Sequence, residues 1–389
     1  MCAKLGNNQG LNPPAIMTPR HFPSFDPAAV AAWLDELAAR HPRPLVCALL
    51  PEAEQARVGD LQGGCNERGL DLLGAIFPAL LTEQGFTTHG LTLVSIENSL
   101  GHFLVPDLAA QPADAAEQIV SAVTRVCQAD GRSGPRQLFL VFDSMLPSIA
   151  SILVKLFDRL KHDFTYAGVN AGSETFQPMP CLFDNQRLLG NGVIGMILDG
   201  ATRIAVEHSY PVAKSLMRAS STAGNRIDKI DGRPAMTVYQ QVIAADFGIE
   251  LTPGNFYDYA VHYPFGLVGS LEILVRIPVA FNEDGSIFCV GEVPANSMLR
   301  LLKAPALENS ACIRTVLRQL GPASSAPLLT FYCAGRRLHF GEEAASELRE
   351  LQADSGATAI HGALSLGEIS TDSHIGIPEF HNAALVCLR

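Results

Sequence analysis

Apolar runs of strand length alternate with amphipathic segments of helical length through the first half of the chain. Asp26-Pro27 predicts the start of a first helix, because Asp caps a helix N-terminus and Pro suits the first helical position. Residues 44–50 (PLVCALL) and 138–142 (LFLVF) are continuously apolar, as strands covered on both faces are. The same pattern predicts further strands at 70–77 and 91–96, and helices at 52–61, 114–127 and 148–161. This alternation indicates an α/β domain with a mostly parallel sheet.

The second half pairs its apolar runs across turn residues. Asp199-Gly200 divides the two runs of 193–206 and suits a tight hairpin turn. Asp284-Gly285 lies in the same way between 271–281 and 286–290. Helices are then expected at 311–320 and 342–352, and strands at 328–333 and 384–388. We therefore expect α+β character with more antiparallel hairpins in this half.

A chain of 389 residues is too long for one ordinary core, so two packed domains are expected. The small polar stretch 220–225 (SSTAGN) places the boundary between a domain at 26–222 and a second at 223–389. Residues 1–25 are expected to form a flexible tail that is not a secretory signal, because a signal needs an apolar run of about 7–15 residues.

The composition limits which cellular compartment and which binding partners we expect. No run approaches the ~20 apolar residues that span a bilayer, and the nine cysteines include no C-x-x-C pair. We therefore expect a cytoplasmic protein with reduced thiols and no membrane insertion. The net charge of −11 would repel phosphates, so no nucleic-acid partner is expected.

Local catalytic signatures are missing from the sequence. Residues 190–195 (GNGVIG) match the letters of a dinucleotide fingerprint, but a strand pattern follows where that motif needs a helix. No phosphate loop, G-x-S-x-G elbow or paired Cys/His zinc spacing is present. We expect no enzyme, with two alternatives: a hydrolase with dispersed Ser, His and Asp, or a structural adaptor with an apolar surface patch.

Two kinds of residue remain as ligand candidates from the pattern alone. The loop 166–176 (YAGVNAGSETF) combines permissive glycines with polar side chains where the chain re-enters the sheet, and it serves equally well as a plain turn. His208 and His262 lie beside apolar runs, where histidines are mostly structural. One axial donor is enough for a haem, so spacing cannot exclude a haem.

Three ordered stretches of the second half resemble the C-terminal FIST domain. They are GNRIDKIDGRPAMTVY at 224–239, FYCAGR at 331–336, and GALSLGEI at 362–369 followed by Phe380-His381-Asn382. Residues 74–80 and 168–176 resemble the N-terminal FIST domain more weakly. Ala363 and Ala383 depart from the family pattern, which leaves the ligand open.

The resemblance implies a small-molecule sensor that reports to a separate signalling protein. One subset of the family implies a haem-based nitric-oxide sensor acting on a histidine kinase, with His208 as the candidate axial ligand. The alternative is an amino-acid-like ligand without haem. We expect Arg336 to bind an anionic group and Glu368 to hold an amine or orient Arg336, although both suit a solvated surface equally well. The full set of predicted ligand-binding residues is Gly168, Asn170, Gly172, Ser173, Glu174, Arg336, Glu368, His381 and Asn382.

Overall fold

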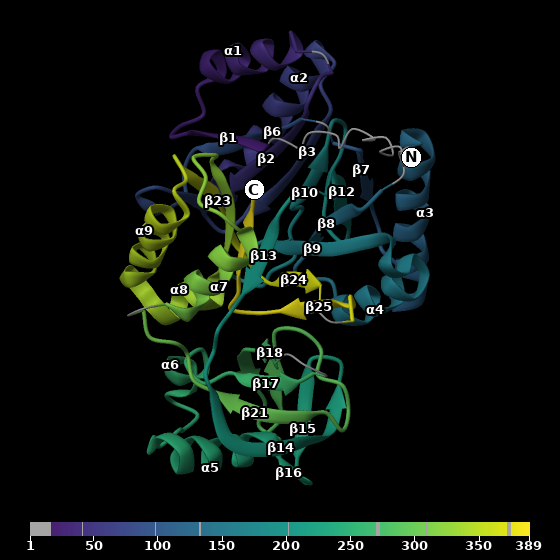
Figure 1. Cartoon of the computed structure of the whole chain (residues 1–389). Helices are drawn as coiled ribbons and strands as arrows, with labels where there is room; N and C mark the ends of the chain where they lie inside the picture. Colours follow the sequence, from purple (N-terminus) through teal and green to yellow (C-terminus); the bar gives the residue numbers. More distant parts are fainter. Residues whose placement is uncertain are drawn as a thin grey trace, which may run out of the picture.

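The described part of the chain forms three mixed sheets and one barrel-like antiparallel sheet (Figure 1). The computed structural model describes residues 17–40, 42–97, 99–131, 134–200, 202–269, 273–307, 310–371 and 375–389. The three mixed sheets and their helices are called the α/β body here, and the fourth sheet with its two helices is called the barrel. The α/β class expected from the sequence is confirmed.

The first sheet has the order β1-β6-β2-β3-β10-β11. Its strands are β1 (Met17–Phe22), β6 (Leu91–Ile96), β2 (Leu45–Pro51), β3 (Leu72–Phe77), β10 (Leu182–Asp184) and β11 (Leu188–Leu189). The helices α1 (Pro27–Ala38) and α2 (Val58–Arg68) pack on it through Trp33, Leu34 and Leu61. Asp26 caps α1 by accepting the N–H of Ala28 at 2.9 Å, as its position predicts.

The second sheet has the order β25-β24-β9-β8-β12-β7. Its strands are β25 (Pro378–His381), β24 (Glu368–Thr371), β9 (Phe164–Ala171), β8 (Arg136–Asp143), β12 (Val193–Asp199) and β7 (Gly101–Val105). The helices α3 (Pro112–Asp130) and α4 (Ile149–Leu160) cover its outer face through Ile119, Ile152 and Leu156.

The third sheet has the order β13-β26-β22-β23-β4-β5. Its strands are β13 (Ile204–Glu207), β26 (Leu385–Leu388), β22 (Leu328–Cys333), β23 (Ile360–Ser365), β4 (Leu80–Thr82) and β5 (Gly85–Thr87). It is covered by α7 (Ala311–Leu320), α8 (Ala334–Phe340) and α9 (Ala344–Ser355). One apolar core joins the inner faces of all three sheets, for example at Phe77, Phe139 and Phe331.

Parallel pairing occurs inside each of these sheets, between β2 and β3, β8 and β9, and β22 and β23. Antiparallel strands flank each parallel pair, so the sheets are mixed. Strands from the last third of the chain complete sheets that the first half begins: β23 pairs with β4, β24 with β9 and β26 with β13.

The barrel is a strongly curved antiparallel sheet of order β18-β17-β21-β14-β15-β20-β19, with β16 paired to β15. Its elements are β14 (Val212–Ala223), β15 (Arg226–Ile230), β16 (Arg233–Pro234), α5 (Ala235–Phe247), α6 (Phe256–Ala260), β17 (Phe265–Val268), β18 (Ile273–Arg276), β19 (Pro278–Phe281), β20 (Ile287–Cys289) and β21 (Met298–Leu302). The chain enters and leaves it side by side, because Lys303 N–H donates to Pro211 O at 3.0 Å. The predicted boundary at 222/223 falls at the end of β14, within the barrel.

Two local expectations differ from the structure, the first hairpin and the N-terminal tail, whereas the second hairpin is confirmed. The hairpin expected around Asp199-Gly200 is wrong, because β12 pairs with β7 and β8 whereas β13 pairs with β26 from the chain end. The hairpin expected around Asp284-Gly285 is confirmed as β19–β20. Of the expected tail, residues 1–16 lie outside the described residues, and Met17–Phe22 forms the edge strand β1, whose hydrogen bonds to β6 fix it.

In the described ranges, no helix combines the length and apolar composition needed to cross a membrane.

Candidate functional site

A cavity of about 260 Å³ lies where the barrel meets the α/β body. We call it the junction cavity. Its lining is almost entirely apolar. The side chains with a polar group are Asn382, Cys333 and Tyr257. It is lined by Phe176, Tyr257, Ala260, Val261, Ile277, Pro278, Val279, Val290, Cys333, Ala334, Gly335, Leu338, Leu366 and Asn382.

Both parts of the molecule build this cavity. The barrel contributes α6 and the β18–β19 corner at Ile277. The α/β body contributes the end of β22 with the start of α8, and the segment after β9 that ends in Phe176. An occupant would therefore touch both parts at once.

Five of the predicted site residues lie together in the sheet next to the cavity, and one of them is part of its wall. In the second sheet Glu368 is opposite Val169 on one side and His381 on the other, which brings Gly168, Asn170 and Asn382 close to it. Asn382 alone among these lines the cavity. Its Oδ1 is buried and has no hydrogen-bond partner among the described residues.

Glu368 is fully buried and joins the wall of the cavity to the sheet. Ser365 Oγ donates to Oε1 at 2.6 Å, and Ala384 N–H donates to Oε2 at 3.1 Å. The Cys333 thiol, which lines the cavity, also donates to this carboxyl group. Burial raises the pKa of Glu368 to about 7, because desolvation disfavours the carboxylate more than these donors favour it. The alternative that Glu368 is a solvated surface carboxylate is therefore wrong.

Arg336 does not reach the cavity, and the expectation that it binds an anionic ligand group is wrong. Its guanidinium is buried and paired with Glu347, with Nη2 at 2.5 Å from Oε1 and Nε at 2.8 Å from Oε2. Nη1 donates to the carbonyl oxygens of His208 and Ala383. Every side of the fork is occupied within the protein, so Arg336 fixes the β22–α8 corner.

The glycine loop has a structural role for most of its residues. A Cβ on Gly168 would lie 2.1 Å from Leu140 O, so glycine is required there by the close approach of β8. Gly172 has a φ of +131°, and Ser173 Oγ accepts the N–H of Thr175 in a local turn. Glu174 pairs with Arg337 on α8 at 2.7 Å. The residue of this segment that lines the cavity is Phe176, which no feature of the sequence pattern singles out.

His208 offers no free nitrogen for a haem iron in this structure. Nε2–H donates to Ile273 O at 2.8 Å, and Nδ1 accepts from Tyr210 N–H at 3.0 Å. Burial lowers the pKa of His208, which keeps it neutral with both nitrogens engaged. The residue thus has the structural role that a lone histidine mostly has. Within the described residues, no group of three or more His, Cys, Asp or Glu is placed to hold a metal ion.

His381 forms a hydrogen bond with Ser370 that has part of the geometry of a hydrolytic site. Ser370 Oγ and His381 Nε2 are 2.6 Å apart. His381 Nδ1 has no partner among the described residues, so no carboxylate there orients the ring. Burial lowers the pKa of His381 well below its ordinary value, which makes it a weak base.

Cys333 and Leu366 fall inside the motifs quoted from the sequence, so a signal existed for them. Tyr257 and Leu338 are 64% and 63% exposed at the cavity mouth, and no local pattern marks them. They reach the cavity only because α6 and α8 meet across the junction between the barrel and the body.

Comparison with known families accounts for most of the chain. Residues 51–233 match the FIST N domain, and residues 235–371 match the FIST C domain. No curated protein matches the sequence. The two domain matches follow one another in order and, between them, cover all but one residue from 51 to 371, so the chain belongs to the FIST family.

Proposed function

We propose that this chain is a signal-transduction sensor that binds a small, largely apolar molecule in the junction cavity. FIST domains are associated with small-ligand sensing, which supports this class of function. The observation that carries the proposal is a cavity of about 260 Å³ whose walls come from both the barrel and the α/β body. A ligand there would stabilise one arrangement of the two parts over others.

The lining defines the chemistry of the ligand. No charged side chain lines the cavity, and the amide oxygen of the lining residue Asn382 has no hydrogen-bond partner among the described residues. An apolar body with one hydroxyl or N–H donor satisfies both features. An amino-acid-like ligand fits less well, because its ammonium and carboxylate groups would be desolvated without partners of opposite charge.

The ligand would be held and released unchanged. Burial raises the pKa of the Cys333 thiol well above its ordinary value, so the nearest thiol stays protonated and is a poor nucleophile. Ser370 and His381 lie in the buried sheet and are not part of the cavity lining. These features support binding over covalent chemistry.

The response would pass through contacts that join the barrel to the body. Arg276 of β18 donates to Phe380 O of β25 at 3.0 Å, and His262 of the barrel contacts His339 of α8. A change in the angle between the parts alters these contacts and the surface around them. We propose that a separate signalling protein, such as a histidine kinase, reads that change.

The haem version of this sensor would need an axial donor other than His208. No contact in the described residues favours haem over an organic ligand. Binding of haem that responds to nitric oxide would therefore contradict the proposal of an organic ligand.

The proposal can be tested by the thermal midpoint with cyclohexanol, cyclohexylammonium and cyclohexanecarboxylate as probes. A ligand that prefers the folded state raises the midpoint through RT ln(1 + [L]/Kd). Cyclohexanol should raise it most. Leu338→Trp fills the cavity mouth at an exposed position and should abolish the shift, whereas Leu216→Trp, a barrel residue that is 53% exposed and outside the lining, should keep it.

Three results would overturn the assignment. Equal shifts in both tryptophan variants would show that the probes bind elsewhere. A Soret band on titration with haemin that moves with nitric oxide would replace the organic ligand by haem. Turnover of any probe, detected by mass spectrometry, would make the chain an enzyme.

A further inference from the structure

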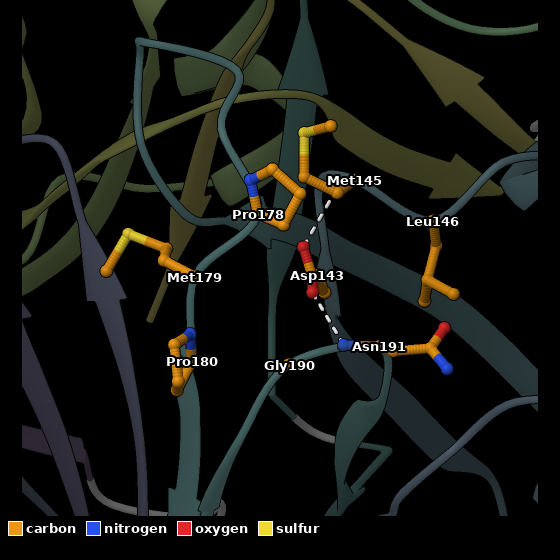
Figure 2. A pocket seen from close by; sticks show the side chains of 8 residues that line it. All are labelled: Asp143, Met145, Leu146, Pro178, Met179, Pro180, Gly190 and Asn191. Atoms are coloured by element: carbon orange, nitrogen blue, oxygen red, sulfur yellow. Dashed lines mark hydrogen bonds between the residues drawn. The ribbon is translucent and has the colours of Figure 1, made fainter.

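A second cavity, of about 320 Å³, lies in the α/β body at the carboxyl end of β8 (Figure 2). We call it the Asp143 cavity. Its walls come from three chain segments: the end of β8, the stretch before β10 and the turn before β12. It is lined by Asp143, Met145, Leu146, Pro178, Met179, Pro180, Gly190 and Asn191. None of these residues lines the junction cavity.

Asp143 is the charged residue of this cavity. It is the last residue of β8 and is 4% exposed. Oδ1 accepts the N–H of Met145 at 2.9 Å, and Oδ2 accepts the N–H of Asn191 at 2.6 Å, as Figure 2 shows. The Cys181 thiol also donates to it. In the part of the chain that the structure describes, its hydrogen-bond donors are therefore neutral groups, and no Lys, Arg or His forms an ion pair with it.

The absence of a side chain at Gly190 leaves room beside the Asp143 carboxylate. A Cβ at this residue would lie 3.0 Å from Asp143 Oδ2 and 2.9 Å from Met179 O. A side chain at this position would press on the carboxylate. Because a carboxylate has about four lone-pair sites, the two backbone N–H groups and one thiol leave capacity for a further donor.

A buried carboxylate with no cation beside it is most stable when a positive charge reaches it. Apart from Asn191 and Gly190, the other lining residues are two methionines, a leucine and two prolines, which suit the apolar body of a ligand. The cavity also lies outside the carboxyl end of a strand in a parallel pair, where open α/β sheets bind ligands.

We propose that the Asp143 cavity is a binding site for a small organic ammonium compound, whose N–H groups donate to Asp143 and whose apolar part packs on Met145, Met179 and Leu146. The site is separate from the junction cavity and does not depend on the function proposed there.

Isothermal titration of the full chain at neutral pH and low salt tests this, with n-butylammonium, butan-1-ol and butyrate as probes. The ammonium compound should bind saturably, the alcohol at least tenfold more weakly, and butyrate not at all. Asp143→Asn should weaken n-butylammonium binding about tenfold or more, which corresponds to the usual worth of a hydrogen bond to a charged group. Circular dichroism checks that this variant folds.

A second variant keeps the test decisive if Asp143→Asn fails to fold. Met145 is 37% exposed, and in Met145→Lys the new ammonium group can reach Asp143 and compete with the probe. Met145→Lys should bind n-butylammonium at least tenfold more weakly than Met145→Gln. Val154→Lys adds the same charge at an exposed position of α4 outside the lining and should bind as the wild type does.

Several outcomes would overturn the site. Equal affinity for the ammonium compound and the alcohol would remove the role of the charge. Equal binding by Met145→Lys and Met145→Gln would place the probe elsewhere, as would loss of binding in Leu338→Trp, which changes only the junction cavity. No binding of n-butylammonium at all would also reject the proposal.

Discussion

Arg336 and Glu347 form a fully buried ion pair in which two nitrogens of the guanidinium contact the two oxygens of the carboxylate, at 2.5 Å and 2.8 Å. Tyr332 Oη and Ser310 Oγ donate to the same carboxylate, at 2.6 Å and 3.0 Å. The pair connects the first turn of α8 to α9 and holds the corner next to the junction cavity.

Glu347→Gln should lower the free energy of unfolding by about 3–5 kcal/mol, because it leaves the Arg336 charge buried without a counterion. Urea denaturation measures this. The matched control is Glu174→Gln, whose partner Arg337 and own side chain are both partly exposed, and it should cost at most about 1 kcal/mol. Similar losses in the two variants would contradict the assignment of a buried pair.

Glu368 should make the protein less stable as the pH rises from about 4.5 to about 7. Its pKa is about 7 in the folded chain and 4.5 ordinarily, so in this window the native state holds a proton that the unfolded state has released. The slope due to this one group is at most about 1.4 kcal/mol per pH unit. Above pH 7 both states are ionised, and the slope vanishes.

Glu368→Gln imitates the protonated side chain and should remove this slope. The measurement is the free energy of unfolding at intervals from pH 5 to pH 8, as the difference between wild type and variant. A difference that stays constant over this range would contradict a raised pKa.

The contact between His262 and His339 should make the protein less stable in acid. His339 Nε2–H donates to Pro305 O, so its Nδ1 accepts from His262 Nδ1–H across 2.5 Å. Burial lowers the pKa of both rings below the ordinary 6.5. This stability is therefore complete above pH 6.5 and is lost as the pH falls through the lowered pKa values, when protonation of His339 removes the acceptor.

Replacing His262 by Phe should flatten the loss of stability between pH 7 and pH 5. Thermal midpoints measured across this range give the comparison, with His89→Asn at an exposed position as the control. An unchanged profile for His262→Phe would separate this pair from the acid response.

Phe176 has a φ of +54°, a backbone conformation that costs a residue with a side chain about 1–2 kcal/mol. Phe176→Gly and Phe176→Ala both remove the ring from the junction cavity, but only glycine relieves the backbone. After the entropy of glycine in the unfolded chain is subtracted, Phe176→Gly should be about 0.5–1 kcal/mol more stable than Phe176→Ala. Chemical denaturation gives both values, and a more stable alanine variant would contradict strain at this residue.

Elements with strong local signals were predicted well from the sequence. The helix Ala311–Leu320 and the strand Leu328–Cys333 have the predicted bounds, because apolar spacing and flanking turn residues act over a few residues. The error at Asp199-Gly200 has the opposite origin. The turn chemistry is suitable, but the partner of β13 is β26 from the end of the chain, and local pattern carries no information on such pairing.

The same contrast between local sequence signals and long-range contacts holds for the candidate site. The motif that ends in Asn382 identified a residue of the cavity wall, whereas Arg336 was assigned to a ligand because its partner Glu347 looks like an ordinary residue of a polar helix. A charge looks available in a sequence until the fold places its counterion. Tyr257 and Leu338 were missed because their neighbours come from other parts of the chain.

The order of pairing in the third sheet has a practical consequence. The junction between the two family matches, at residues 233–235, lies inside the barrel, and β4 and β13 pair with strands from the other side of it. A fragment cut there would expose unpaired strand edges and half of a core, so neither piece has what it needs to fold by itself. For expression and for genetic exchange, we therefore expect the two matched regions to behave as a single unit, whose halves restore the structure only by assembling together.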